Sequence, residues 1–215
     1  LWHIVANGLP LDFTVADPTE TAPDLCGAPL MPALCHHCPS EWYVLTTEEA
    51  RSLAEAGAHG VEVYNHTSEL GSARGSGIAT LDQLANEGFR MHLTATDDSH
   101  MVPEDAFGGW VMVAADRLDS AAIIAALKAG AFYSSRGPDF TSITLAAGQL
   151  HVATSPVNRI VLAGGGHRAW DRQGNGLTSA TFDLGSVDAD YIRLVITDEH
   201  DRQAWSNIFW MADLT

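Results

Sequence analysis

The chain has 215 residues and a formal net charge of −16, from 27 acidic and 11 basic residues. This balance argues against nucleic acid as a partner, because binding a phosphate backbone needs clustered Lys and Arg. Hydrophobic residues make up 46 % of the chain, enough for a core, yet no stretch reaches the roughly eighteen apolar residues of a membrane span. We therefore expect neither nucleic acid nor membrane as a partner.

The three cysteines, Cys26, Cys35 and Cys38, are too few and too close together for a secreted disulfide framework. They favour a reducing compartment, and we expect a cytoplasmic protein. No signal peptide is visible, but the chain begins at Leu1, so a lost amino-terminal signal stays an alternative.

The first part of the chain alternates short apolar runs with capped helical stretches, which predicts βα units and a mainly parallel sheet. The predicted strands cover residues 3–9, 61–65, 92–96, 110–115 and 132–135. The predicted helices cover residues 46–57, 80–88 and 119–130. Thr46 with Glu49, and Thr80 with Gln83, have the spacing of capping boxes, and a glycine follows each of these two helices.

The pattern changes near residue 140. Residues 141–215 contain short runs of β-branched and aromatic residues between Gly, Asp and Asn, which predicts a small antiparallel β module. We therefore divide the chain into an α/β part, 1–140, and an all-β part, 141–215. The glycine-rich stretch 71–77 lacks the ending of a phosphate-binding loop, and we expect it to be a mobile loop.

Two acids and a histidine follow the strand predicted at 92–96. Asp97, Asp98 and His100 stand where ligand-facing residues lie in α/β barrels, at the junction of a strand and the next loop. The Asp-x-His pair places a carboxylate beside an imidazole, and both bind Zn, Mn or Fe. The alternative is a turn in which Asp accepts backbone hydrogen bonds and His is solvated.

A second candidate is "CHHCPSEW", residues 35–42. Its Cys-x-x-Cys spacing suggests a zinc or redox site, but a structural zinc needs a second ligand pair and a thioredoxin-like site would open a helix. A histidine close to a proline at a strand end is the better metal-ligand candidate, and either His36 or His37 could serve. His3, in the first predicted strand, is an ordinary half-buried histidine when it is taken alone. Arg74, in a glycine-rich loop, either contacts an anionic substrate or is solvated.

Five segments taken in order resemble one family. They are "GVEVYN" (60–65), "ATDDSH" (95–100), "FGGWVMV" (107–113), "AALKAGAFYSSRGP" (125–138) and "AWSN" (204–207). Together they resemble the PHP (polymerase and histidinol phosphatase) superfamily, and more narrowly its CehA/McbA-like metallohydrolases. The resemblance implies a distorted (β/α)7 barrel with two or three divalent metal ions, Zn, Mn or Fe. It also implies a metal-bound hydroxide that attacks a phosphoester or a related small-molecule ester, such as a carbamate.

The resemblance also implies roles for individual residues. Asp98 and His100 match the family's Asp-x-His and are the expected catalytic residues. The expected metal ligands are His3, His37, Asp98 and His100. Asn65 and Arg74 are candidates for substrate binding, and Asp97 either orients an imidazole or caps the loop.

The chain departs from the family at its start, because residues 1–30 lack the family's His-x-His strand, its Asp-His pair and its Glu. We therefore expect a partial barrel over 1–140 with weak metal retention, and an open sheet edge through which the chain forms a homo-oligomer. Two alternatives stay open. One is a non-catalytic degenerate barrel that serves as a binding or assembly module, and the other is a structural α/β protein with an incidental Asp-x-His.

Overall fold

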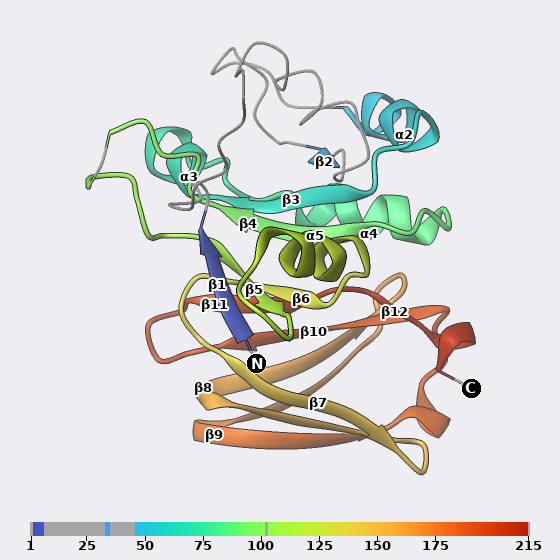
Figure 1. Ribbon diagram of the computed structural model, residues 1–215. Helices are drawn as coiled ribbons and strands as arrows, with labels where there is room; N and C mark the ends of the chain where they lie inside the picture. Colours follow the sequence, from blue (N-terminus) through green and yellow to red (C-terminus); the bar gives the residue numbers. More distant parts are fainter. Residues whose placement is uncertain (1, 7–32, 35–45, 102, 215) are drawn as a thin grey trace. The chain divides into compact units, whose positions relative to one another are not determined.

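A computed structural model describes residues 2–6, 33–34, 46–101 and 103–214 (Figure 1). The chain divides into two compact units, Leu1–Phe132 and Tyr133–Thr215. The division lies a few residues before the boundary expected near residue 140. Each unit has a hydrophobic core of its own.

The first unit combines a parallel sheet with an antiparallel strand pair. Its strands are β1 (Trp2–Ala6), β2 (Ala33–Leu34), β3 (Gly60–Asn65), β4 (His92–Thr96) and β5 (Trp110–Ala114). Its helices are α2 (Thr47–Glu55), α3 (His66–Ser72), α4 (Ile78–Asn86) and α5 (Ser120–Lys128). Strands β2, β3 and β4 pair in parallel, whereas β1 pairs antiparallel with β5.

The helix starts follow their caps, though not always the expected ones. The capping box of α2 is confirmed, since Thr46 accepts from Glu49 N and the Glu49 side chain accepts from Thr46 N. The box expected at Thr80 is wrong, because α4 begins two residues earlier, after Gly77. Position 77 requires a glycine, because the Cβ of any other residue would lie 2.3 Å from the carbonyl oxygen of Glu62.

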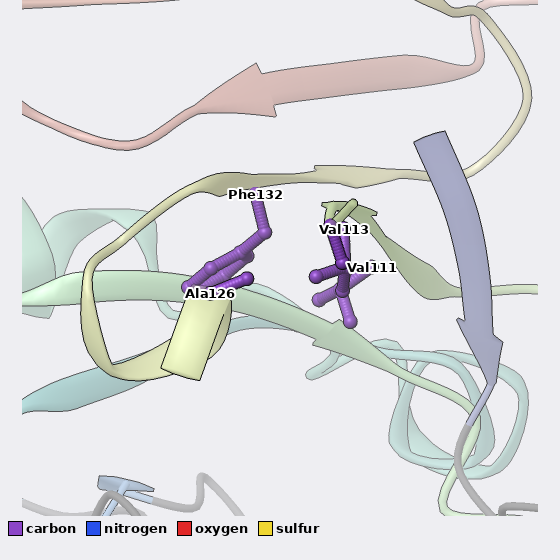
Figure 2. Close-up of a cluster of buried hydrophobic side chains, with 5 residues drawn as sticks. Val111, Val113, Ala126 and Phe132 are labelled. Carbon is purple, nitrogen blue, oxygen red and sulfur yellow. The ribbon is translucent and has the colours of Figure 1, made fainter. Parts of the chain in front are cut away.

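The core of the first unit lies partly between β5 and α5. Val111 and Val113 occupy alternate positions of β5 and point to one face, where they pack with Ala126 of α5 and with Phe132 (Figure 2). This alternation follows from the two-residue period of a strand. Each large apolar side chain buried here stabilises the unit by about 1.5–3 kcal/mol.

The second unit is an antiparallel β structure. Its strands are β6 (Phe132–Ser135), β7 (Phe140–Ala146), β8 (Gln149–Gly164), β9 (Ala169–Asp183), β10 (Tyr191–Thr197), β11 (Gln203–Ser206) and β12 (Phe209–Trp210). The order is β6-β11-β10-β8-β7, with β9 on β8 and β12 on β10. Two single-turn 3-10 helices, η1 (Leu184–Ser186) and η2 (Met211–Asp213), are present as well. Ile160 and Leu162 of β8 and Ile192, Leu194 and Ile196 of β10 are fully buried and form its core.

The expected partial (β/α)7 barrel is wrong. The structure is mostly antiparallel sheet, with 43 % strand against 24 % helix, whereas repeated βα units would bring at least as much helix as strand. Among the described residues, only β2, β3 and β4 form a parallel sheet, and β5 pairs antiparallel with β1. No helix in the described part of the chain is both long and apolar enough to cross a membrane.

Candidate functional site

The candidate site lies in the first unit, at the carboxyl ends of the neighbouring parallel strands β3 and β4. These ends meet at one edge of the sheet, where Asn65 stands beside Thr96 in the strand register. The loop from Asp97 to Gly109 follows β4 and leads to β5. It carries both members of the Asp-x-His motif, Asp98 and His100, and its anchors decide where they lie.

A β-bulge in β3 gives the site its first unusual feature. The pairing with β4 shifts between Glu62 and Tyr64, so that one extra residue, Val63, is inserted. In a regular strand, side chains three residues apart point to opposite faces, but an inserted residue brings them to the same face. Glu62 and Asn65 consequently meet, and Asn65 Nδ2 donates to Glu62 Oε2 at 3.1 Å.

Glu62 is a buried carboxylate with a hydrogen-bond donor at each oxygen. The residue is 5 % exposed, Oε2 accepts from Asn65, and Oε1 accepts from the hydroxyl of Thr96 in β4. A buried charge needs such partners to offset the loss of hydration. The bonds tie the ends of β3 and β4 together through side chains as well as through the backbone.

Asp98, two residues after the end of β4, accepts from the same amide. Asn65 Nδ2 donates to Asp98 Oδ2 at 3.1 Å, so one NH2 group bridges two carboxylates. The backbone of Asp98 is left-handed, with φ 52°. Asp tolerates this region better than most residues, but it is still uncommon and marks sites where the surrounding structure imposes the conformation.

Asp97 has a separate task, although it is the next residue. The residue is 2 % exposed, and its carboxylate accepts three backbone N–H groups, those of Phe107 at 2.7 Å, Gly108 at 2.7 Å and Gly109 at 2.8 Å. It therefore closes the loop, which is the capping role that the sequence left open. Its carbonyl oxygen also accepts from the backbone N–H of Thr67 in α3 at 3.0 Å.

Asp105 is the second anchor of the loop. Its carboxylate accepts from the backbone N–H of His100 at 2.6 Å, from that of Met101 at 3.0 Å and from the hydroxyl of Ser99 at 2.7 Å. These donors, the N–H of His100 first among them, lower the pKa of Asp105 to about 2. The backbone of His100 is thereby fixed, while its imidazole is exposed to solvent.

The end of the loop packs closely against the start of α3. An added Cβ at Gly108 would lie 2.1 Å from Cγ of His66, so a glycine is required there. A hydrogen bond of 3.0 Å joins Nδ1 of His66 to the hydroxyl of Tyr64. His66 thus has a packing role at the start of α3.

The other predicted site residues lie apart from this cluster or outside the described part. His3 is in β1, opposite Val113 of β5, and its side chain lies outside the described residues, as do His36 and His37. Arg74 is exposed. The stretch around it is not a simple mobile loop, because Gly75 and Gly77 lie along β3, where Gly75 O accepts from Asn65 N at 2.9 Å.

The donor set fits a divalent cation in part. Asp98 and His100 are a carboxylate and an imidazole on one short loop, but catalytic zinc sites use three protein ligands. Within the described ranges, no group of three or more His, Cys, Asp and Glu side chains has the arrangement of a metal site. The other two expected ligands are the side chains of His3 and His37, which lie outside the residues that the structure describes.

Two residues of the site, Glu62 and Asp105, were not predicted from the sequence. In the sequence, Glu62 occupies an ordinary position of a predicted strand, and no nearby residues predict the bulge that brings it to the same face as Asn65. Asp105 stands five residues after His100, and its role depends on how the loop folds back. An acid inside the apolar "GVEVYN" is the one signal that could have drawn attention to Glu62, because buried acids need partners.

Comparison of the chain with models of protein families, with curated proteins and with solved structures gives no match.

Proposed function

We propose that the chain is a metal-dependent hydrolase of the PHP type that cleaves a phosphoester or a related small ester, with Asp98 and His100 as ligands of a divalent cation. The single observation that carries the proposal is the carboxylate of Asp98. It is held beside the buried Glu62 by a shared amide, at the carboxyl ends of two parallel strands. Ligand sites of α/β proteins lie at this edge of a sheet.

The electrostatics of this edge favour a cation. Glu62 and Asp98 are two carboxylates that share one neutral donor group, and a positive charge near them would relieve their mutual repulsion. A bound divalent ion supplies a Lewis acid that lowers the pKa of water and polarises the ester. The expected metals are Zn, Mn or Fe, since a carboxylate and an imidazole suit all three.

In this proposal some residues bind the cation and others hold the loop that carries them. Asp98 and His100 provide ligand atoms, and Asp97 and Asp105 fix the loop on which both stand. The imidazole of His100 reaches solvent, so it is accessible to an ion and to a substrate. In this proposal Arg74, which is exposed, attracts an anionic ester, and His3 and His37 complete the ligand set.

Metal analysis of the purified chain tests the proposal most directly. We expect added Mn²⁺ or Zn²⁺ to bind weakly, at one ion per chain, and both Asp98→Ala and His100→Ala to raise the Kd by about tenfold or more. Glu104→Gln, a change at an exposed acid of the same loop, is the control. Equal binding by all four proteins would place the ion elsewhere and refute the proposal.

Activity is the second measurement, with a chromogenic phosphodiester and an aryl carbamate as substrates. We expect metal-dependent turnover that disappears with Asp98→Ala and survives Glu104→Gln. The chain's departures from the family predict that this turnover is slow. Turnover that is unchanged after complete removal of metal would contradict the proposal.

The second candidate is a non-catalytic module that assembles through a sheet edge. One observation favours it, the strand β9, which has fifteen residues, is mostly exposed and pairs with β8 alone among the described strands. An exposed strand edge is a template for pairing with another chain. Sedimentation over a range of concentrations tests this, and a monomer at every concentration would refute self-assembly.

A further inference from the structure

Asn65 occupies the centre of the site, yet it is 0 % exposed. A substrate does not reach a side chain in that position, so the direct contact suggested by the sequence does not explain why an amide stands there. Its hydrogen bonds supply a different explanation, because both ends of the amide are used inside the protein.

The orientation of the amide follows from its partners. The backbone N–H of Ser68 can only donate, and it lies 2.8 Å from the atom assigned as Oδ1, so that atom must be the oxygen. Nδ2 consequently faces the two carboxylates, Glu62 Oε2 and Asp98 Oδ2, each at 3.1 Å. The two hydrogens of one NH2 group thus match two acceptors, and no other arrangement satisfies all three partners.

Three elements meet in this one residue. Asn65 ends β3, and its Oδ1 caps the first turn of α3. Through Nδ2 it contacts Glu62, which the bulge of β3 brings to the same face, and Asp98, which follows β4. Asp98 has a left-handed backbone, and the bond to Asn65 gives its side chain a fixed direction in that conformation.

We propose that Asn65 is a positioning residue, which fixes the carboxylate of Asp98 beside Glu62 and thereby sets the affinity of the site for a divalent cation. This role rests on the proposed function. Groups that orient a metal ligand typically change metal affinity by about 10- to 100-fold when they are removed. Asn65 acts through Asp98, so its contribution disappears when Asp98 is absent.

Asn65→Ser is the informative variant. Serine retains a side-chain oxygen that can cap α3, and it adds no charge, but it removes the NH2 donor. The matched control is Thr96→Val, which removes the other donor to Glu62 and leaves the bond between Asn65 and Asp98 in place. Comparing the two variants distinguishes the loss of the hydrogen bond to Asp98 from the loss of a hydrogen bond to the buried Glu62.

The experiment measures the Kd of Mn²⁺ by titration calorimetry for the full chain and for these variants. We expect Asn65→Ser to raise the Kd about tenfold or more, and Thr96→Val to raise it by less than about threefold. In an Asp98→Ala background, adding Asn65→Ser should change the Kd by less than about twofold, because the two residues act as a unit.

The outcomes are distinct. Equal Kd values for Asn65→Ser and the unchanged chain would overturn the positioning role and leave the proposed function in place. An equal loss with Thr96→Val would also overturn it, because the effect would then pass through Glu62. Failure of the unchanged chain to bind Mn²⁺ would overturn the proposed function and the role of Asn65 with it.

A metal-free measurement checks the contact itself. In amide NMR spectra, the two side-chain protons of Asn65 should differ clearly from those of a solvated asparagine, and Asp98→Ala should shift one of them more than the other. Resonances at the positions of a solvated asparagine would overturn the positioning role, whatever metal the chain binds.

Discussion

Asp97 Oδ2 accepts the backbone N–H of Phe107 at 2.7 Å, and this bond joins the end of β4 to the turn that precedes β5. Donor and acceptor are ten positions apart in the sequence, so the contact closes the loop that carries Asp98 and His100. Two further backbone N–H groups point to the other oxygen of the same carboxylate. A charged acceptor at this position is therefore part of the fold.

Replacing Asp97 with Asn should destabilise the protein by about 2–3 kcal/mol, because an amide nitrogen would then face at least one of the backbone N–H groups that the carboxylate accepts. Urea unfolding followed by circular dichroism measures the loss. Glu104→Gln removes one charge from an exposed position of the same loop and should change stability by less than about 0.5 kcal/mol. Equal stabilities for the two variants would show that the three bonds contribute little.

Phe107 has a left-handed backbone, with φ 65°, and a side chain that is 75 % exposed. A bulky residue is strained in that region, whereas glycine is not. Phe107→Gly should therefore be more stable than Phe107→Ala by about 1 kcal/mol, against the usual order for these two residues. Thermal unfolding of the pair measures the difference, and an alanine variant that is the more stable would indicate that the loop relaxes to an ordinary conformation.

Asp105 should contribute to stability at acidic pH. Its pKa in the folded protein is lowered to about 2, mainly by the N–H of His100, from an ordinary value of 3.8. A lowered pKa means that the contribution is fully present above about pH 4 and is lost as the pH falls toward 2. The stability of Asp105→Asn should accordingly fall less steeply over that range than the stability of the unchanged chain. Asp116→Asn, at an exposed site, is the control and should keep the original slope.

We expect His92 to make the stability of the protein depend on pH in a second range, above that of Asp105. Burial, with a smaller contribution from His59, lowers the pKa of His92 below its ordinary value of 6.5. Its ring packs against Phe132, with 5.8 Å between the ring centroids. Folding thus favours the neutral ring, so this contribution is present above about pH 6.5 and declines as the pH falls below that value.

A His92→Gln variant should be less stable than the unchanged chain at pH 7.5 and should lose less additional stability between pH 7 and pH 5. Chemical unfolding at several pH values measures both quantities. His167→Gln, at an exposed position of the second unit, should keep the original pH dependence. A slope that is the same in all three proteins would show that His92 titrates normally in the folded state.

Local signals in the sequence predicted several elements correctly. The box formed by Thr46 and Glu49 identifies the start of α2, because the groups that interact are three residues apart and need no other part of the chain. Strand β4 was predicted with its observed bounds, 92–96. Helix α3 was not predicted, since seven residues are too few to show a helical period.

Local sequence patterns predicted the position of the candidate site, at the acids and the histidine after β4, and most helices and strands of the first unit, although not α3. The roles of the two adjacent acids and the pairing of β5 depend on contacts between distant parts of the chain. Asp97 accepts backbone N–H groups that close the loop, whereas the adjacent Asp98 accepts from the amide of Asn65. Strand β5 pairs antiparallel with β1, where a parallel barrel was expected. The physical reason is that caps and periodicity depend on neighbours within a few residues. Strand partners, the bulge at Val63 and the donors to a buried carboxylate come from residues far apart in the chain, and folding alone brings them together.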